Sequence, residues 1–419
     1  MKIKKITAYE ILDSRGNPTV RVKLETENGI VTSANVPSGA STGEHEALEL
    51  RDNDPARFNG KGVLQAIKNI KEKIAPELIN IEITNQEEAD RRMIKLDGTA
   101  NKANLGANAI LGVSLATARA FAEESHLPLY KYLAQLNDSA KEKIVLPDPM
   151  CNVINGGAHA DSGLDIQEYM LVATGIDSIQ EKIRALSEIY QALKIKLKKD
   201  KYTVAVGDEG GFAPRLKSNE EPLEYLTMAV KDAGYEVGKE INFALDVAAS
   251  QFYNQQSQKY FLKLDGKEMS AEELIDYYEE LIAKYPIIII EDGLAEDDLE
   301  GWKLFNQRCG EKVNIMGDDF TVTNKQRLKL ALENKALNSI LIKPNQIGTL
   351  TETLECIKIS HEHNLKIAIS HRSGDTQDDF IADLAVGVGA DWLKAGSMAR
   401  SERLSKYNRL LEIKNEEEN

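Results

Sequence analysis

The pattern of apolar and polar positions changes from strand-like to helix-like early in the chain. Residues 2–36 alternate apolar and polar side chains in three runs separated by the turn sequences DSRGNP and ENG, which predicts an antiparallel meander. From Gly62 to about Leu136 the apolar residues recur with a helical period. We therefore predict an N-terminal α+β domain over residues 1–137, and the polar stretch 137–143 is the best candidate for a linker.

The remaining residues, 144–419, are dominated by short apolar runs that each end in a charged side chain. In the clearest of them, residues 285–293 (YPIIIIEDG), four isoleucines lead into Glu291 and Asp292. A continuous β-branched run of this length is typical of a buried strand in a parallel sheet. Five other runs share this design and end at or beside Asp246, Asp318, Lys343, His371 with Arg372, and Lys394.

The spacing of these charges predicts a closed α/β barrel. From Glu291 to Lys394 they follow one another at intervals of 23 to 28 residues, and a βα unit of such a barrel takes roughly 30 residues. The carboxyl ends of the strands form one rim, where barrel enzymes place their chemistry. We expect three acids and three cations to face a common centre there: Asp246, Glu291, Asp318, Lys343, Arg372 and Lys394.

The segment that opens this second domain has a hairpin-like pattern. Residues 146–172 predict a strand, a glycine-rich loop that carries His159, and a second strand that carries Gln167 and Glu168.

Further along, residues 203–214 (TVAVGDEGGFAP) predict a strand that ends in Glu209. We expect helices over about 179–199 and 220–237, and regular βα repeats from 241 to about 398. The last residues, KNEEEN, have no apolar face and are expected to fray.

The charge balance narrows the choice of partners. The chain has 52 basic and 67 acidic side chains and a net charge of -15, which disfavours direct binding of nucleic acid or of an anionic membrane surface. An acidic protein that gathers Lys343, Arg372 and Lys394 on one rim builds a local anion site, so we expect an anionic substrate.

Cysteine usage and the N-terminus point to a soluble cytosolic protein. Cys151, Cys309 and Cys356 are far apart and lack CxxC spacing, which argues against a disulfide framework or a zinc site. The N-terminus has no apolar signal core, and no window approaches the length of a membrane span.

The acids on the rim suggest a metal site. Asp246, Glu291 and Asp318 offer oxygen ligands from successive strands, without Cys or His, and such a set suits Mg²⁺. The alternative is that acids at strand ends only cap the helices that follow. His361 and His363 resemble a metal pair, but they are two apart on an expected helix and so point in different directions.

The cations and the remaining carboxylates suggest proton transfer and phosphate binding. Lys343 follows an apolar run and is either a snorkelling side chain or a base whose pKa nearby Mg²⁺ and Lys394 would lower. Arg372 and Ser373 suit a phosphate group, unless the guanidinium forms a salt bridge to a loop acid. Glu168 and Glu209 would form a carboxyl pair on the side opposite Lys343, where one shared proton suits a general acid.

At these positions the chain resembles a known family. The motifs SRGNPT, VPSGASTGEHEALELRD, GDEGGFAP, EDGLAEDD, GDDFTVTN, LIKPNQIGT, SHRSGDT and KAGSMARSERLSKYN occur in order and together resemble enolase of the bacterial type, from the meander to the C-terminus. The resemblance implies an α/β fold in which an N-terminal α+β domain caps an atypical C-terminal (β/α)8 TIM-type barrel. It departs from the commonest pattern at Pro344, in SGDTQDD and in AGSMARSER, none of which touches a proposed catalytic position.

The resemblance also implies an activity, the interconversion of 2-phosphoglycerate and phosphoenolpyruvate, and a role for each matching residue. It makes Lys343 the base at C2 and Glu209 the acid for the C3 hydroxyl, assisted by Glu168 and His159. It implies substrate contacts by Gln167, Lys343, His371, Arg372, Ser373 and Lys394. It assigns the first of two Mg²⁺ ions to Asp246, Glu291 and Asp318, and the second to Ser41 in the SGASTG loop.

Partners and location follow from the same resemblance. The family forms homodimers or octamers and is cytoplasmic, and some bacterial members are also found on the cell surface or secreted. Two alternatives remain open: an acid-sugar dehydratase or racemase of the wider superfamily, and a binding protein for host surface proteins or an RNA-degrading complex. The motifs SGASTG and SHRSGDT are not expected in the first, and the second would be additional to catalysis because every catalytic position is filled.

Overall fold

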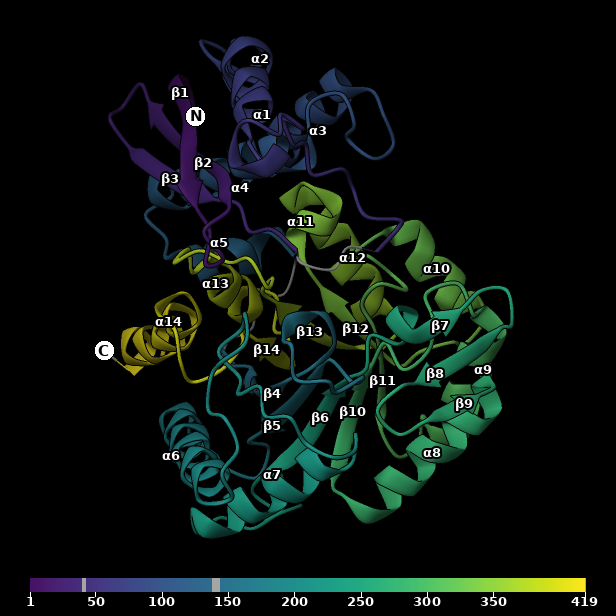
Figure 1. Ribbon diagram of the computed structural model, residues 1–419. Helices are drawn as coiled ribbons and strands as arrows, with labels where there is room; N and C mark the ends of the chain where they lie inside the picture. The colour runs from purple at the N-terminus through teal and green to yellow at the C-terminus, as the bar shows by residue number, and fades with distance from the viewer. Residues whose placement is uncertain (40–42, 138–143, 419) are drawn as a thin grey trace.

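The computed structural model describes residues 1–39, 43–137 and 144–418. An N-terminal sheet and its helices lie against one side of a larger barrel, as Figure 1 shows. Strands β1 (Ile3–Leu12), β2 (Pro18–Thr26) and β3 (Val31–Asn35) pair antiparallel in that order, so the predicted meander is confirmed. The predicted linker falls on 137–143, of which residues 138–143 lie outside the described residues.

The helices of the N-terminal part pack against this meander. They are α1 (Leu64–Asn69), α2 (Ala75–Leu78), α3 (Gln86–Asp97), α4 (Ala107–Glu124) and α5 (Leu129–Leu136), and a π-helical turn at Ile70–Ile74 joins the first two. Helix α4 is apolar on almost every face because it packs on β2 and β3 and also on helices of the barrel.

Eight strands close the barrel in the order β10-β11-β12-β13-β14-β4-β5-β6. Their bounds are β4 (Asp148–Asn155), β5 (Glu168–Val172), β6 (Asn242–Asp246), β10 (Ile287–Glu291), β11 (Asn314–Gly317), β12 (Ser339–Ile342), β13 (Lys366–Ser370) and β14 (Trp392–Lys394). Neighbouring strands are parallel except β5, which runs antiparallel to both β4 and β6. The atypical barrel implied by the resemblance is thus confirmed.

The barrel is filled rather than hollow. One separate apolar cluster takes at least one side chain from each of the eight strands: Met150, Met170, Val172, Ala244, Ile289, Met316, Leu341, Ala368 and Trp392. Since the strands of a barrel share only their inner face, this cluster is the interior, and the chemistry is left to the rim.

Helices and one small sheet surround the barrel. The helices are α6 (Ile179–Lys199), α7 (Glu221–Asp232), α8 (Ala271–Lys284), α9 (Leu299–Cys309), α10 (Lys325–Glu333), α11 (Pro344–Ile347), α12 (Leu350–Glu362), α13 (Phe380–Gly387) and α14 (Ser401–Glu418). Between β6 and α8 the chain forms a three-stranded antiparallel sheet of β7 (Tyr253–Asn254), β8 (Lys259–Leu262) and β9 (Lys267–Met269). The expected regular repeats from 241 were therefore wrong for the first unit, which contains this insertion.

Two further expectations were wrong. The segment before Glu209 is not a strand of the described structure and makes only isolated bridges, because the chain turns back at Gly210 (φ +88°) and Gly207 donates to the carbonyl of Gly211. The C-terminal residues do not fray as far as Glu418. Helix α14 continues through them, and Glu417 accepts a 2.8 Å hydrogen bond from the Tyr130 hydroxyl.

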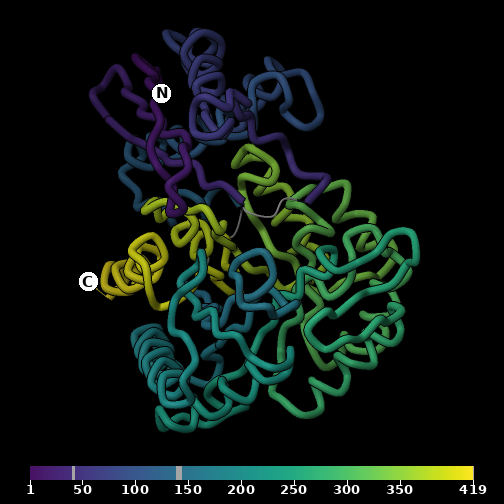
Figure 2. The backbone as a smooth tube through the Cα atoms, viewed as in Figure 1, coloured from purple at the N-terminus to yellow at the C-terminus, as the bar shows by residue number. Residues whose placement is uncertain are grey.

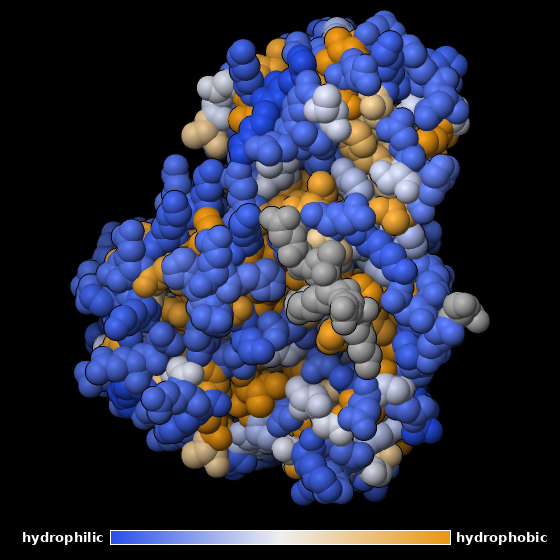
Figure 3. Space-filling model, turned by 180° about the vertical axis from the view of Figure 1, so that it is seen from behind, coloured by the Kyte–Doolittle hydropathy of each residue, from blue (hydrophilic) through white to orange (hydrophobic). Residues whose placement is uncertain are grey.

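The turn that follows β1 contacts the C-terminal part of the chain beside the barrel. In Figure 2 the first turn of the N-terminal meander reaches the C-terminal segment, and the Ser14 hydroxyl donates to the carbonyl of Ser373 across 3.1 Å. The opposite face of the molecule is mostly polar, with small apolar areas between charged side chains (Figure 3). Among the described helices, none combines the length and the apolar composition needed to cross a membrane.

Candidate active site

The carboxyl ends of the parallel strands bring the predicted charges to one rim. Asp246, Glu291 and Lys394 are the last residues of β6, β10 and β14, and Asp318, Lys343 and His371 directly follow β11, β12 and β13. The acids do not cap the helices that follow, since the N-caps of α8, α9 and α10 are Ser270, Asp298 and Asn324. The capping alternative is therefore wrong for these acids.

Glu168 reaches the same rim for a different reason. It is the first residue of β5, and because β5 runs antiparallel, its beginning lies beside the carboxyl ends of its neighbours. Glu168 pairs in register with Asp246 on one side and with Asn155 on the other. Gln167 immediately precedes it, and its amide donates to Asp246 over 3.2 Å.

One cavity at this rim gathers most of the predicted residues. It is lined by His159, Gln167, Glu168, Glu209, Asp246, Lys343, Ser370, His371, Arg372, Ser373 and Lys394. Glu291 and Asp318 are buried and contact the two lysines of the cavity. Ser41 lies outside the described residues.

Lys394 is the shared counter-charge of three buried carboxylates. Its ammonium lies 2.7 Å from Glu291, 3.0 Å from Asp246 and 3.3 Å from Glu168, and its side chain is 2% exposed. Burial and repulsion from Asp246 still hold the pKa of Glu291 well above its usual range, although Lys394 opposes them. One ammonium therefore does not balance the negative charge gathered here.

This excess of buried carboxylate charge fits a divalent cation. Asp246, Glu291 and Asp318 offer only oxygen ligands, and Asp318 and Asp246 are among the groups that raise the pKa of Glu291 by repulsion. Their oxygens are engaged by Lys343 and Lys394, however, and the three acids do not form a group whose ligand atoms all lie within 4.8 Å of one another. Among the described residues, such groups are His159 with Glu168 and Glu209, and Asp292 with Asp318 and Asp319. The chemistry of the predicted ligands fits Mg²⁺.

Lys343 is ion-paired with Asp318. Burial lowers the pKa of the Lys343 ammonium, and Arg372 and Lys394 also lower it, but the pairing with Asp318 outweighs them and the pKa lies above its usual value. The expectation of a lowered pKa rested on a bound cation as well as on Lys394, and with a bound cation it stays a prediction.

Arg372 forms a salt bridge to an acid that the sequence did not single out. Its guanidinium lies against Glu46, with Nη1 2.9 Å from Oε2 and Nη2 3.0 Å from Oε1, and Asn345 accepts a further bond. Of the two interpretations offered for Arg372, the salt bridge is therefore present. The pair is bidentate, as a phosphate contact would be.

Glu168 and Glu209 form the expected carboxyl pair together with His159. Ligating atoms of the three side chains lie within 4.8 Å of one another, and the Asn152 amide donates to Glu209 over 2.9 Å. Burial and repulsion from Glu209 hold the pKa of Glu168 well above its usual range.

The second member of this pair behaves in the opposite way. Burial acts to raise the pKa of Glu209, but His159, His371 and Arg403 outweigh it and hold the pKa well below its usual range. The pKa values of the two carboxyl groups are therefore shifted in opposite directions, that of Glu168 upward and that of Glu209 downward.

Several contributing residues were missed by the sequence analysis. Glu46 and Asn152 contact Arg372 and Glu209, which lie far from them in the sequence. Gln346, in the short helix α11, donates to Asp318 over 2.8 Å. The sequence feature that could have indicated Gln346 is its position about one helical turn after Lys343. His361 and His363 are both exposed and each contacts a different backbone carbonyl, which agrees with their dismissal as a metal pair.

Comparison with known proteins agrees with this architecture. The family model "Enolase, N-terminal domain" matches residues 3–133, and "Enolase, C-terminal TIM barrel domain" matches residues 143–419. A curated protein of a Nitratiruptor species, named enolase, is 52% identical over 411 residues, which cover 98% of this chain and 96% of that protein. The chain belongs to the enolase family.

Proposed function

We propose that this protein is a carbon–oxygen lyase that interconverts 2-phospho-D-glycerate and phosphoenolpyruvate plus water, as in glycolysis and gluconeogenesis. The observation that carries the proposal is the cavity at the barrel rim, where Lys343 and the Glu168–Glu209 pair line the same small space as Arg372, Ser373 and Lys394. This arrangement has a base, an acid and an anion site together, which the loss of water from a phosphorylated hydroxy acid requires.

Lys343 is the proposed base for the C2 proton. Its ammonium must first lose a proton, and its pairing with Asp318 opposes that loss. Mg²⁺ held by Asp246, Glu291 and Asp318 would supply positive charge beside the substrate carboxylate, and this charge favours the loss of the C2 proton. Arg372 and Lys394 already act in the direction of a neutral amine.

Glu209 is the proposed acid for the departing C3 hydroxyl, with Glu168 and His159 as its partners. Because the pKa of Glu168 is raised and that of Glu209 is lowered, we propose that a proton passes from Glu168 to Glu209 before or as the C3 hydroxyl leaves. Asn152 fixes Oε2 of Glu209 by its 2.9 Å bond, and Oε1 faces His159 at 3.6 Å and His371 at 3.4 Å.

The remaining lining residues are the proposed substrate contacts. Gln167, His371, Arg372, Ser373 and Lys394 present amide, imidazole, guanidinium, hydroxyl and ammonium groups to the cavity. The substrate phosphate would take the bidentate position on Arg372 that Glu46 now holds.

Other features of the proposal rest on the family. We propose a second Mg²⁺ near Ser41, assembly as a homodimer or an octamer, and a cytoplasmic location, with domains at residues 1–137 and 144–419. Secondary binding of host surface proteins or of an RNA-degrading complex, from the cell surface or a secreted form, would be additional to catalysis.

The direct test is turnover of 2-phosphoglycerate by the purified protein, followed by the ultraviolet absorbance of phosphoenolpyruvate. We expect product with Mg²⁺, no product after a chelator removes divalent cations, and recovery when Mg²⁺ is restored. A Mg²⁺-loaded, folded sample that leaves 2-phosphoglycerate unchanged would refute the proposal.

A further inference from the structure

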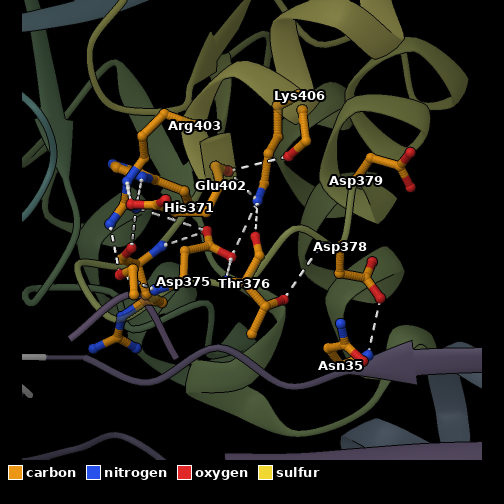
Figure 4. Close-up of polar contacts among 12 residues, drawn as sticks. Asn35, His371, Asp375, Thr376, Asp378, Asp379, Glu402, Arg403 and Lys406 are labelled. Carbon is orange, nitrogen blue, oxygen red and sulfur yellow. Dashed lines mark hydrogen bonds and ion pairs between the residues drawn. The ribbon is translucent and has the colours of Figure 1, made fainter. Parts of the chain in front are cut away.

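A single buried guanidinium lies behind the candidate site. Arg403 is in the first turn of α14 and is fully buried, and Figure 4 shows its side chain reaching His371. Its Nη1 lies 2.6 Å from Nδ1 of His371 and 2.6 Å from the carbonyl of Arg372. Its Nη2 lies 2.6 Å from the carbonyl of Ser373 and 3.0 Å from that of Asp208.

This contact fixes the tautomer of His371. A guanidinium has only donors, so an imidazole nitrogen 2.6 Å from it must be the acceptor and carries no proton. Burial and the charge of Arg403 lower the pKa of His371 to about 4, although Glu209 opposes them. A neutral imidazole without a proton on Nδ1 carries it on Nε2, and Nε2 lies 3.4 Å from Oε1 of Glu209.

We infer that Arg403 is a positioning residue for the proposed reaction, which holds His371 in its neutral Nε2–H tautomer with that N–H facing the carboxyl group of Glu209. In this state both nitrogens of His371 are committed, one to Arg403 and one to its own proton. The imidazole can donate to Glu209 but cannot accept a proton from it. A proton that Glu209 receives from Glu168 is thereby kept for the substrate hydroxyl and is not lost to His371.

The backbone around Arg403 leaves room for its side chain and offers it hydrogen-bond acceptors. Gly396 has φ +78°, and a Cβ there would lie 2.7 Å from Cδ of Arg403, so the chain leaves room for the side chain to pass. The carbonyl of Asp208, directly before Glu209, is one of the acceptors, so the same guanidinium locates the imidazole and the backbone of the acid it serves.

Lys406 provides a matched control one turn along α14. It is equally buried, and its ammonium donates to the carbonyls of Thr376 and Glu402 over 2.6 Å and to Asp375 over 3.2 Å. In Figure 4 it reaches the same loop as Arg403 but not His371. Its loss should lower stability without changing the tautomer.

The first arm of the test reads the tautomer by long-range ¹H–¹⁵N NMR of the full chain labelled at histidine. The His371 signals are identified by their absence in a His371→Asn variant. We expect a single neutral Nε2–H form in the wild type, loss of that single form in Arg403→Met, and its partial return in Arg403→Lys, whose ammonium can still donate. A wild-type Nδ1–H or charged form, or an unchanged tautomer in both folded variants, would overturn the inference.

The second arm is kinetic and rests on the proposed function. In Arg403→Met we expect dehydration to slow by about 10- to 100-fold, the usual effect of removing a group that orients a functional side chain. Exchange of the C2 proton with solvent should be retained. Lys406→Met should keep both rates and lose only thermal stability. If Arg403→Met does not fold, the NMR spectra of the wild type and of Arg403→Lys still test the tautomer of His371. If the wild type does not turn over 2-phosphoglycerate, the function fails while the tautomer remains readable.

Discussion

Lys394→Met removes the one ammonium that three buried carboxylates share. Glu291, Asp246 and Glu168 lie 2.7, 3.0 and 3.3 Å from that ammonium, and all three are nearly inaccessible to solvent. Removing one partner of a buried ion pair costs about 3–5 kcal/mol, because the remaining charge has no compensation. At about 2 °C per kcal/mol for a large domain, the expected loss in Tm is roughly 6–10 °C.

The assay is a thermal melt in chelator, followed by the same melt with Mg²⁺. The control is Lys239→Met, since Lys239 is 73% exposed in its pair with Glu236 and its loss should cost less than about 1 kcal/mol. Added Mg²⁺ should raise the Tm of Lys394→Met more than that of the wild type, because the cation replaces the missing charge. A Lys394→Met protein that melts with the wild type in chelator would refute the role of Lys394 as the shared counter-charge.

Two other predictions test contacts between the N-terminal part and the barrel. Asp378→Asn breaks the partly buried bidentate pair with Arg119 at 2.8 and 2.9 Å and should cost about 1.5–3 kcal/mol at pH 7. Burial acts to raise the pKa of the Asp378 carboxyl, but Arg119 outweighs it and holds this pKa below its usual value. The ion pair therefore stabilises the folded protein fully above the pKa of the unfolded chain. This stabilisation is lost as pH falls through the lower pKa of the folded protein. The difference in Tm between the two proteins should narrow as pH falls below about 4, and a difference that stays constant down to about pH 3 would contradict the pairing. Glu46→Gln should tighten binding of inorganic phosphate about tenfold, since Arg372 no longer has to leave a carboxylate; calorimetry that gives an unchanged Kd would contradict this.

The sequence predicted the barrel rim well because its signal is local. Each parallel strand is a short apolar run, and the residue at its end, such as Glu291 or Lys394, is placed by the strand alone. The same reasoning could not show that β5 runs antiparallel, because an isolated run of apolar residues has no direction. Glu168 lies on the rim because β5 is antiparallel to its neighbours, and the spacing of apolar residues does not show strand direction.

The contacts that set charge states were less predictable. Glu46 is far from Arg372 in sequence, and Arg403 lies on the C-terminal helix, so only the folded chain brings either to the site. The sequence did not show that Asp318 pairs with Lys343 and raises the pKa of its ammonium against the effects of Arg372 and Lys394. The segment before Glu209 looked like a strand from its apolar residues, yet the glycines beside it fold the chain back, so that Phe212 makes only single bridges with Val206 and with Ile154.

The most direct test of the proposed mechanism is exchange of the C2 proton of 2-phosphoglycerate with deuterated solvent, measured beside dehydration in the wild type and two variants. Lys343→Ala should abolish exchange and dehydration together, because it removes the base. Glu209→Gln should retain exchange while dehydration falls by about 100- to 10,000-fold, the usual contribution of a positioned acid. Normal dehydration by Glu209→Gln, or exchange that survives in Lys343→Ala, would contradict the assignment of base and acid to the two sides of this cavity.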